Sequence, residues 1–154
     1  MNRKRIHSHI PHIKTITDFF RKYGLGIPLH PEIMCMRLED QPDTKLMHMP
    51  LYRANFFRVI FFNKANLQFS AVEKKHTVSE NYLCFTYPGK LESWTRTSRL
   101  YGYIIYFTPS FAGLDLTNKY FDRDYPYFHF YSELYLTLSA AEAETLKQQS
   151  EELV

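Results

Sequence analysis

Two strand-like segments of the sequence place a charged side chain among aromatic ones. The first is "LYRANFFRVIFF", residues 51–62, and the second is "LESWTR", residues 91–96. Side chains of a β-strand point alternately to its two faces, so Tyr52 and Arg58 share one face of the first segment with apolar residues. By the same rule, Glu92 and Trp94 share one face of the second segment. An arginine, a glutamate and aromatic rings would suit a sugar or a small aromatic or carboxylated compound. If the strand assignment is wrong by one residue, Arg58 instead lies on the outer, solvated face.

A further aromatic segment surrounds Tyr103. One face of this predicted strand carries Tyr103 and its neighbours two positions away, and the other face carries Ile104 and Tyr106. Either row could line a pocket, and either could simply fill the interior of the fold, as Trp94 could too. We take Tyr103 as the candidate binding residue of this strand.

The remaining residue types predict neither a catalytic centre nor a metal site. The sequence contains no nucleophile-elbow pattern, glycine-rich phosphate loop or paired-carboxylate motif. Its seven histidines are scattered, and no two of them lie four residues apart on a predicted helix. The two cysteines, Cys35 and Cys84, lie in apolar strand-like segments rather than at metal-ligand spacing, so we expect both to be buried free thiols.

The composition predicts a single globular domain. A chain of 154 residues is long enough to bury a core without a disulfide or a metal, and its 17% of aromatic residues favours a ring-lined core or pocket. A net charge of +3 is too small to indicate nucleic-acid binding by itself. No apolar stretch is long enough for a membrane span or a secretion signal, so we expect a cytoplasmic protein without a membrane partner.

The body of the chain is expected to be a β-sandwich or barrel. Residues 1–14 predict a solvated arm, and residues 17–23 predict a short helix that ends at Gly24. Eight strand-like runs follow, separated by polar or turn-forming residues. These runs are residues 32–38, 46–52, 55–62, 66–73, 76–78, 81–87, 91–97 and 100–107. Beyond Thr108 we expect short helices and loops over the barrel, and then a last strand within residues 132–138.

Residues 139–154 predict a helix. The hydroxyl of Ser139 can accept a hydrogen bond at the start of the helix, while Glu142, three residues on, reaches back to form a capping box. The stripe of this helix that is suited to packing consists of Ala143, Leu146, Ser150 and Leu153. Such a stripe packs either on its own domain or on a partner chain.

Three stretches of the sequence resemble a known family. In order along the chain they read "YRANFFRVIFF", "NYLCFTYPGKLESW" and "LYGYIIYFTPSFAG". Together they resemble the N-terminal effector-binding domain of AraC-family bacterial transcription regulators, over about residues 32–113. The resemblance rests on the order and spacing of the three stretches, and it implies a cupin-like jelly-roll barrel with a helix after it.

The resemblance also implies what stands in place of a metal centre. Metal-binding cupins carry His-x-His-x-x-x-Glu on their first strand and a histidine after a later Pro-Gly turn. The corresponding residues here are Tyr52, Ala54, Arg58 and Glu92. Only Glu92 would bind a metal well, and Arg58 stands where the glutamate ligand would be, so no metal or other cofactor is expected. Arg58 and Glu92 would then be neighbours and form an ion pair. Tyr52 and Trp94 would lie alongside this pair.

The function implied by the resemblance is ligand sensing and not catalysis. A small effector would enter the barrel and contact Tyr52, Arg58, Glu92, Trp94 and Tyr103. The chain would form a homodimer through the stripe of its last helix. DNA would be bound only by a separate C-terminal helix-turn-helix domain that is missing from this chain.

The predicted organisation has three parts: an arm and short helix in residues 1–30, the barrel in residues 31–138, and the C-terminal helix in residues 139–154. Two other functions stay open. One is a stand-alone, metal-free cupin enzyme, for which Arg58 and Glu92 would be the candidate catalytic pair. The other is a small-molecule binding protein without a regulatory partner domain.

Overall fold

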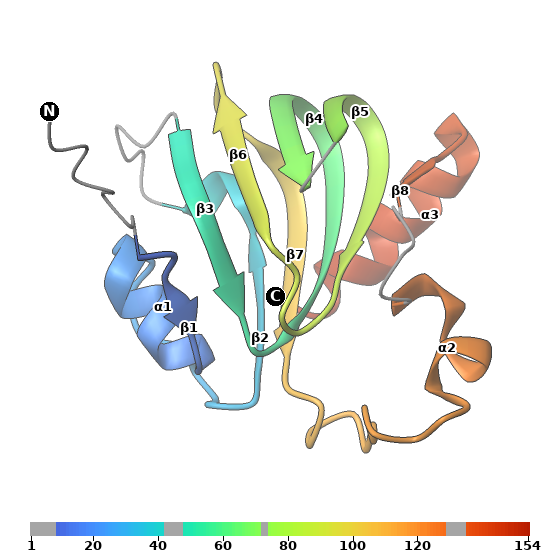
Figure 1. Cartoon of the computed structure of the whole chain (residues 1–154). Coiled ribbons are helices and arrows are strands. Elements are labelled where there is room, and N and C mark those ends of the chain that lie inside the picture. Colours follow the sequence, from blue (N-terminus) through green and yellow to red (C-terminus); the bar gives the residue numbers. More distant parts are fainter. Residues whose placement is uncertain (1–8, 42–47, 72–73, 129–134) are drawn as a thin grey trace, which may run out of the picture.

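The structure is a computed structural model that describes residues 9–41, 48–71, 74–128 and 135–154. It is mainly β: the described residues form eight strands, three α-helices and two short 3-10 helices (Figure 1). In chain order these elements are β1 (His12–Ile13), α1 (Ile16–Tyr23), β2 (Ile33–Arg37), η1 (Leu38–Asp40), β3 (His48–Ala54), β4 (Phe57–Ala71), β5 (Lys74–Thr86), β6 (Glu92–Arg96), β7 (Tyr101–Phe107), α2 (Phe121–Asp124), η2 (Pro126–Phe128), β8 (Tyr135–Thr137) and α3 (Ala140–Glu151). The strands curl into a barrel-like arrangement flanked by α1 and α3 (Figure 1), which confirms the predicted fold class.

Strand β4 belongs to both halves of the barrel. Residues 57–64 of β4 pair with β7, whereas residues 67–71 pair with β6. The register of its pairing with β5 shifts between Lys64 and Leu67, where one half passes into the other. One half therefore has the strand order β1-β3-β6-β4-β5, and the other has the order β2-β7-β4-β5-β8.

Two predicted strand breaks are wrong, because β4 and β5 are each one continuous strand. The break predicted in β4 lay at polar residues that include Asn63 and Lys64, which are exposed where the strand passes from one half to the other. An exposed bend needs no apolar side chains, so a polar run there interrupts the sequence pattern without ending the strand. In β5 the predicted break lay next to Asn81, whose φ of 53° is unusual for a strand but does not end it.

Helix α1 begins one residue before its predicted start and ends where the sequence predicts. The hydroxyl oxygen of Thr15 accepts a hydrogen bond from the backbone N–H of Asp18 at 3.0 Å, which caps the helix start. Gly24 ends the helix with a φ of 64°, a left-handed conformation that glycine adopts without strain. The prediction of a helix over residues 17–23 that stops at Gly24 is therefore confirmed.

Helix α1 packs against both halves of the barrel. The ring of Phe19 lies 6.0 Å from that of Tyr52 on β3 and 5.7 Å from that of Tyr106 on β7, between ring centroids. Ile16 and Phe20 have no exposed surface. The helix thus belongs to the same hydrophobic core as the strands.

The predicted N-terminal arm is partly a strand. His12 and Ile13 form β1, which pairs in parallel with Arg53 and Ala54 of β3. Ile13 is buried, because the strand lies over the core next to α1. Residues 1–8 of the predicted arm lie outside the described residues.

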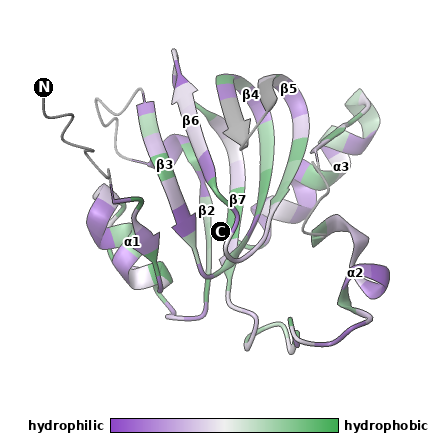
Figure 2. Ribbon diagram, in the orientation of Figure 1, coloured by the Kyte–Doolittle hydropathy of each residue, from purple (hydrophilic) through white to green (hydrophobic). Residues whose placement is uncertain are grey.

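The residues after β7 cover the outer surface of the barrel, as predicted. Helix α2 is largely hydrophilic (Figure 2), whereas η2 contributes Phe128 to an aromatic cluster. The ring of Phe128 lies 4.6 Å from that of Phe57 on β4 and 5.7 Å from that of Phe85 on β5. The expected last strand is β8, although residues 129–134 lie outside the described residues. Within the described ranges, no helix has the length and apolar character needed to cross a membrane.

Helix α3 begins at the predicted capping box. The Ser139 hydroxyl accepts a hydrogen bond from the Glu142 backbone at 3.2 Å, and the Glu142 carboxylate accepts one from the Ser139 backbone at 2.8 Å. These two bonds occupy backbone N–H groups that a helix start otherwise leaves unpaired. They also hold the pKa of Glu142 below its usual range.

The predicted stripe of α3 faces the barrel over most of its length. Ala143 and Leu146 pack against Tyr103 on β7, and Ser150 is also buried. Leu153 follows the end of the helix and is 60% exposed. Of the two alternatives left by the sequence, the first three residues of the stripe therefore pack on their own domain.

Candidate functional site

Tyr52 and Glu92 lie opposite each other on the paired strands β3 and β6. The Tyr52 hydroxyl donates a hydrogen bond to Oε1 of Glu92 at 2.6 Å. Both side chains point into the barrel and are buried, with 1% and 2% of their surfaces exposed. The predicted inner faces of these two strands are therefore confirmed.

The Pro-Gly turn that precedes β6 is anchored on β3. The backbone N–H of Gly89 donates to the carbonyl oxygen of Ala54 at 2.8 Å, and Nη1 of Arg53 donates to the carbonyl oxygen of Gly89 at 2.5 Å. Gly89 has a φ of 84°, as the third residue of a type II turn requires. The anchored turn fixes the start of β6 and so the position of Glu92.

Arg58 reaches this pair from β4. Its guanidinium donates a hydrogen bond to the Tyr52 hydroxyl at 2.6 Å and forms an ion pair with the Glu92 carboxylate. It also lies 5.8 Å from the ring centroid of Phe19 and 5.5 Å from that of Tyr52, within range of a cation–π interaction. Arg58 is 5% exposed, so its charge is compensated inside the protein. The predicted Arg58–Glu92 ion pair is confirmed, and we call Tyr52, Arg58 and Glu92 the buried triad.

The buried triad does not fit the metal centre of a metal-binding cupin. A guanidinium is permanently protonated and has no lone pair to offer a cation. The oxygens of Tyr52 and Glu92, which could have been ligands, are already occupied by Arg58. In the part of the chain that the structure describes, no group of three His, Cys, Asp or Glu side chains lies close enough together to hold a metal ion.

The hydroxyls around the buried triad stay protonated near neutral pH. Burial raises the pKa of Tyr52, although the nearby charge of Arg58 opposes the shift. Burial also raises the pKa of Tyr106, again against the effect of Arg58. Among the described residues, two buried polar atoms lack a hydrogen-bond partner: Nε of Arg58 and Oγ1 of Thr86, on facing positions of β4 and β5. Such unpaired groups mark places where a water or a ligand can complete the bonding.

A cavity of about 70 Å³ lies beside Arg58, between the two halves of the barrel and α1. Its wall is mostly apolar or aromatic and includes Tyr23 of α1, Trp94 of β6 and Tyr106 of β7. Two charged side chains of the described residues also line it, Arg58 and Arg96, and each is 5% exposed. One water needs roughly 10–15 Å³ of such space, so the cavity is large enough for a small organic molecule.

The predicted binding residues separate into three groups. Arg58 and Trp94 line the cavity. Tyr52 and Glu92 are not part of the cavity wall and instead hold Arg58 in position. Tyr103 is not brought to the cavity, because it lies on the outer face of β7 beneath α3. The prediction that Tyr103 contacts a ligand inside the barrel is therefore wrong.

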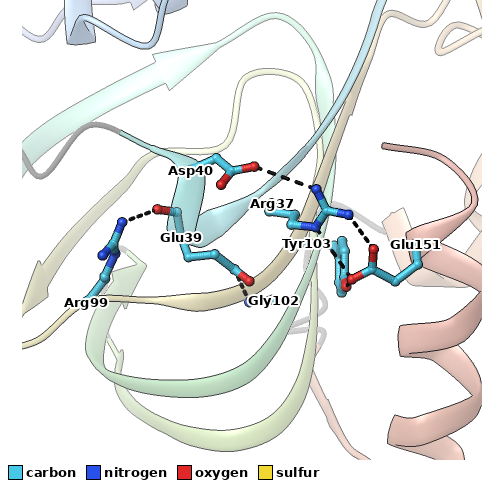
Figure 3. A network of polar contacts seen from close by, with 7 residues as sticks. All are labelled: Arg37, Glu39, Asp40, Arg99, Gly102, Tyr103 and Glu151. Atoms are coloured by element: carbon cyan, nitrogen blue, oxygen red, sulfur yellow. Dashed lines mark hydrogen bonds and ion pairs between the residues drawn. The ribbon is translucent and has the colours of Figure 1, made fainter.

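Tyr103 instead belongs to a polar network that holds α3 on the barrel. Its hydroxyl donates a hydrogen bond to the carboxylate of Glu151, and Arg37 of β2 forms an ion pair with the same carboxylate (Figure 3). We call Arg37, Tyr103 and Glu151 the α3 clasp. The hydrogen bonds from Arg37 and Tyr103 hold the pKa of Glu151 below its usual range. Burial and the bond to Glu151 raise the pKa of Tyr103 to about 12.

The short helix η1 contacts both the cavity and the region of the α3 clasp. Leu38 lines the cavity. Glu39, the next residue, accepts a hydrogen bond from the backbone N–H of Gly102 at 3.1 Å, and its carbonyl oxygen accepts one from Arg99 at 2.5 Å (Figure 3). Because η1 directly follows Arg37, one continuous segment connects the wall of the cavity to the clasp.

Several residues of the cavity wall were not among the predicted binding residues. Arg96 lies two positions after Trp94, so the alternation rule could have placed it on the same inner face. Tyr106 lies on the other face of β7 from Tyr103, and the sequence allowed either face to line a pocket. Tyr23 carried no comparable signal, since the place of a helix on a barrel depends on tertiary packing.

The two cysteines are free, as predicted, but they differ in burial. Cys84 is buried, and burial raises the pKa of its thiol to about 12. Cys35 is only half-buried, so the prediction of burial is confirmed for Cys84 alone. Cys84 therefore stays a protonated, unreactive thiol at neutral pH.

No protein-family model matches the chain, and no curated protein matches it either. The resemblance to AraC-type effector domains thus rests on the three stretches of sequence described above. Their residues form the strands that build the buried triad and much of the cavity wall.

Proposed function

We propose that the chain is the ligand-sensing domain of an AraC-type transcription regulator, which binds a small effector in its barrel without chemical conversion. The observation that carries this proposal is the cavity beside Arg58. It lies between both halves of the barrel and α1, and its wall combines apolar side chains with a few polar groups. This combination is typical of small-molecule binding sites.

The buried triad supports binding without conversion. In a metal-binding cupin, this position would hold the reactive ion. Here Glu92 accepts a hydrogen bond from Tyr52, forms an ion pair with Arg58 and is not part of the cavity wall. A general base must reach the substrate, so the arrangement offers little support to the alternative of a metal-free enzyme.

The segment from the cavity to α3 offers a physical route for a signal. A ligand can shift a conformational equilibrium only by its different affinity for the two states. A ligand in the cavity would touch Leu38, and the residue before it, Arg37, binds Glu151 of α3. In this proposal, occupancy of the cavity changes how firmly the clasp holds α3, and α3 leads to the DNA-binding domain.

A binding screen tests the proposal. The purified chain is tested by thermal unfolding against a library of small metabolites that includes sugars, organic acids and their amides. We expect at least one compound to raise the melting temperature in a concentration-dependent manner, because a ligand that binds only the folded state stabilises it. The same compound should change the amide hydrogen exchange of α3.

Two matched variants localise the binding. Ile104→Phe enlarges a side chain in the cavity wall and should abolish the thermal shift. Leu136→Phe makes a similar change at a 40% exposed position and should preserve it. The sensor proposal fails if no compound stabilises the chain. Whether the coding sequence continues past Val154 into a helix-turn-helix domain distinguishes a regulator from a plain binding protein.

A further inference from the structure

The charged side chains that line the cavity among the described residues are both arginines. Arg58 and Arg96 both line the cavity and are almost fully buried. No carboxylate of the described residues lines it, because Glu92 meets Arg58 outside the wall. Among the described residues, a ligand in the cavity would face two guanidinium groups and no carboxylate, and guanidinium N–H groups donate their strongest hydrogen bonds to an anionic oxygen.

The apolar part of the wall argues against a sugar. Phe62, Leu67 and Ile104 illustrate its character, and Trp94 adds a large aromatic surface. A sugar carries a hydroxyl on nearly every carbon, and each hydroxyl buried against such side chains without a partner costs free energy. An apolar or aromatic body with a single polar end fits this wall better.

Arg58 is already oriented for an anion. Tyr52 and Glu92 hold two of its guanidinium nitrogens, so the side chain needs no further ordering when a ligand binds. Its Nε–H has no acceptor among the described residues. A buried donor without an acceptor is unfavourable, and an oxygen of a bound ligand would supply the missing partner.

We propose that the cavity binds a small organic carboxylate, whose charged end lies against Arg58 and Arg96 and whose apolar or aromatic body lies against the rest of the wall. This inference rests on the proposed sensing function and names its ligand class. Planar guanidinium groups recognise carboxylates by two parallel hydrogen bonds, which a neutral amide or alcohol of the same shape cannot match.

Paired compounds test the ligand class. Benzoate, phenylacetate and hexanoate are compared with their primary amides and with neutral sugars, by titration calorimetry at constant pH and ionic strength. At least one acid should bind, about tenfold or more tightly than its own amide, because a hydrogen bond to a charged group is stronger than a neutral one.

Variants of arginine test the position of the carboxylate. Arg96→Met should weaken binding of the acid by about tenfold or more and leave binding of the amide nearly unchanged. Arg96→Lys, which keeps the charge, should retain part of the affinity and shows whether loss of binding comes from loss of folding. Arg123→Met makes the same change on exposed helix α2 and should have no effect.

The outcomes separate the two proposals. If amides or sugars bind as tightly as the acids, the carboxylate assignment is wrong but the sensor proposal stands. If an acid binds and Arg96→Met does not weaken it while the variant remains folded, the assigned position is wrong. If no compound of any class binds, the carboxylate assignment and the sensing function both fail.

Discussion

Arg58 and Glu92 each have a high cost of burial that the other offsets. An isolated charge of either sign loses its hydration in the interior of a protein, and this loss costs roughly several kcal/mol. The ion pair recovers much of this cost, and the Tyr52 hydroxyl binds both partners. The two charges are therefore expected to depend on each other in the folded state.

A double-mutant cycle measures this dependence. Glu92→Gln and Arg58→Met should each lower the free energy of unfolding by about 3–5 kcal/mol, because each leaves the other charge buried without its partner. The double variant should lose less than the sum of the two. Urea unfolding of the four proteins gives the coupling energy, and additive effects would rule out the ion pair.

Gly102 on β7 is constrained by its close approach to β4. Its φ is 136°, and an added Cβ would lie 2.0 Å from the carbonyl oxygen of Phe61. Gly102→Ala should therefore destabilise the protein by several kcal/mol, roughly, since backbone atoms cannot move aside easily. Thermal unfolding measures the change.

Gly113 provides the matched control. It also has a positive φ, of 64°, but an added Cβ would meet no atom of the described residues within 4 Å. Gly113→Ala should cost only about 1–2 kcal/mol, the price of the left-handed backbone alone. Equal effects of the two substitutions would show that the contact with β4 is unimportant.

At the scale of the elements, α3 is held by groups that titrate in acid. Hydrogen bonds hold the pKa of Glu151 below its usual value, so its stabilising effect is complete above about pH 4.3. That effect is lost as the pH falls through the lowered pKa and the carboxylate is protonated. The protection of the α3 amides, relative to the intrinsic exchange rate at each pH, should decrease in this acid range, in part because Glu142 at the helix start behaves in the same way.

Single substitutions distinguish the contribution of the α3 clasp from that of the capping box at Ser139 and Glu142. Glu151→Gln should already show faster exchange of α3 at pH 7, together with a smaller further change in acid. Glu152→Gln, at the exposed next position, should exchange like the parent protein. If Glu151→Gln exchanges like the parent at both pH values, the α3 clasp does not hold the helix.

The sequence alone predicts which side chains point inward where one face of a strand is buried and the other is exposed. Tyr52 and Arg58 could be placed inside because a slip of one residue would expose a whole apolar row. This argument fails at Tyr103, because α3 buries the outer face of β7 and both of its rows are apolar. It also fails at Asn63, where an exposed bend interrupts the apolar pattern within a continuous strand.

At the scale of the whole molecule, less of the predicted dimer surface on α3 is exposed than the sequence indicated. Ala143 and Leu146 pack against the barrel, which leaves Leu153 as the exposed member of the predicted stripe. We expect sedimentation to show a dimer for the parent chain and a monomer for Leu153→Glu. Leu136→Glu, at another exposed leucine, is the control. A monomeric parent chain would reject dimerisation of this chain.

The shared strand β4 has a consequence for how the protein unfolds. Because residues 57–64 serve one half of the barrel and residues 67–71 the other, neither half can lose its central strand without disturbing the other. Both halves should therefore unfold in a single cooperative transition. The slowest-exchanging amides of β6 and β7, which have no pairing with each other in the described sheet, should then report one common free energy of opening.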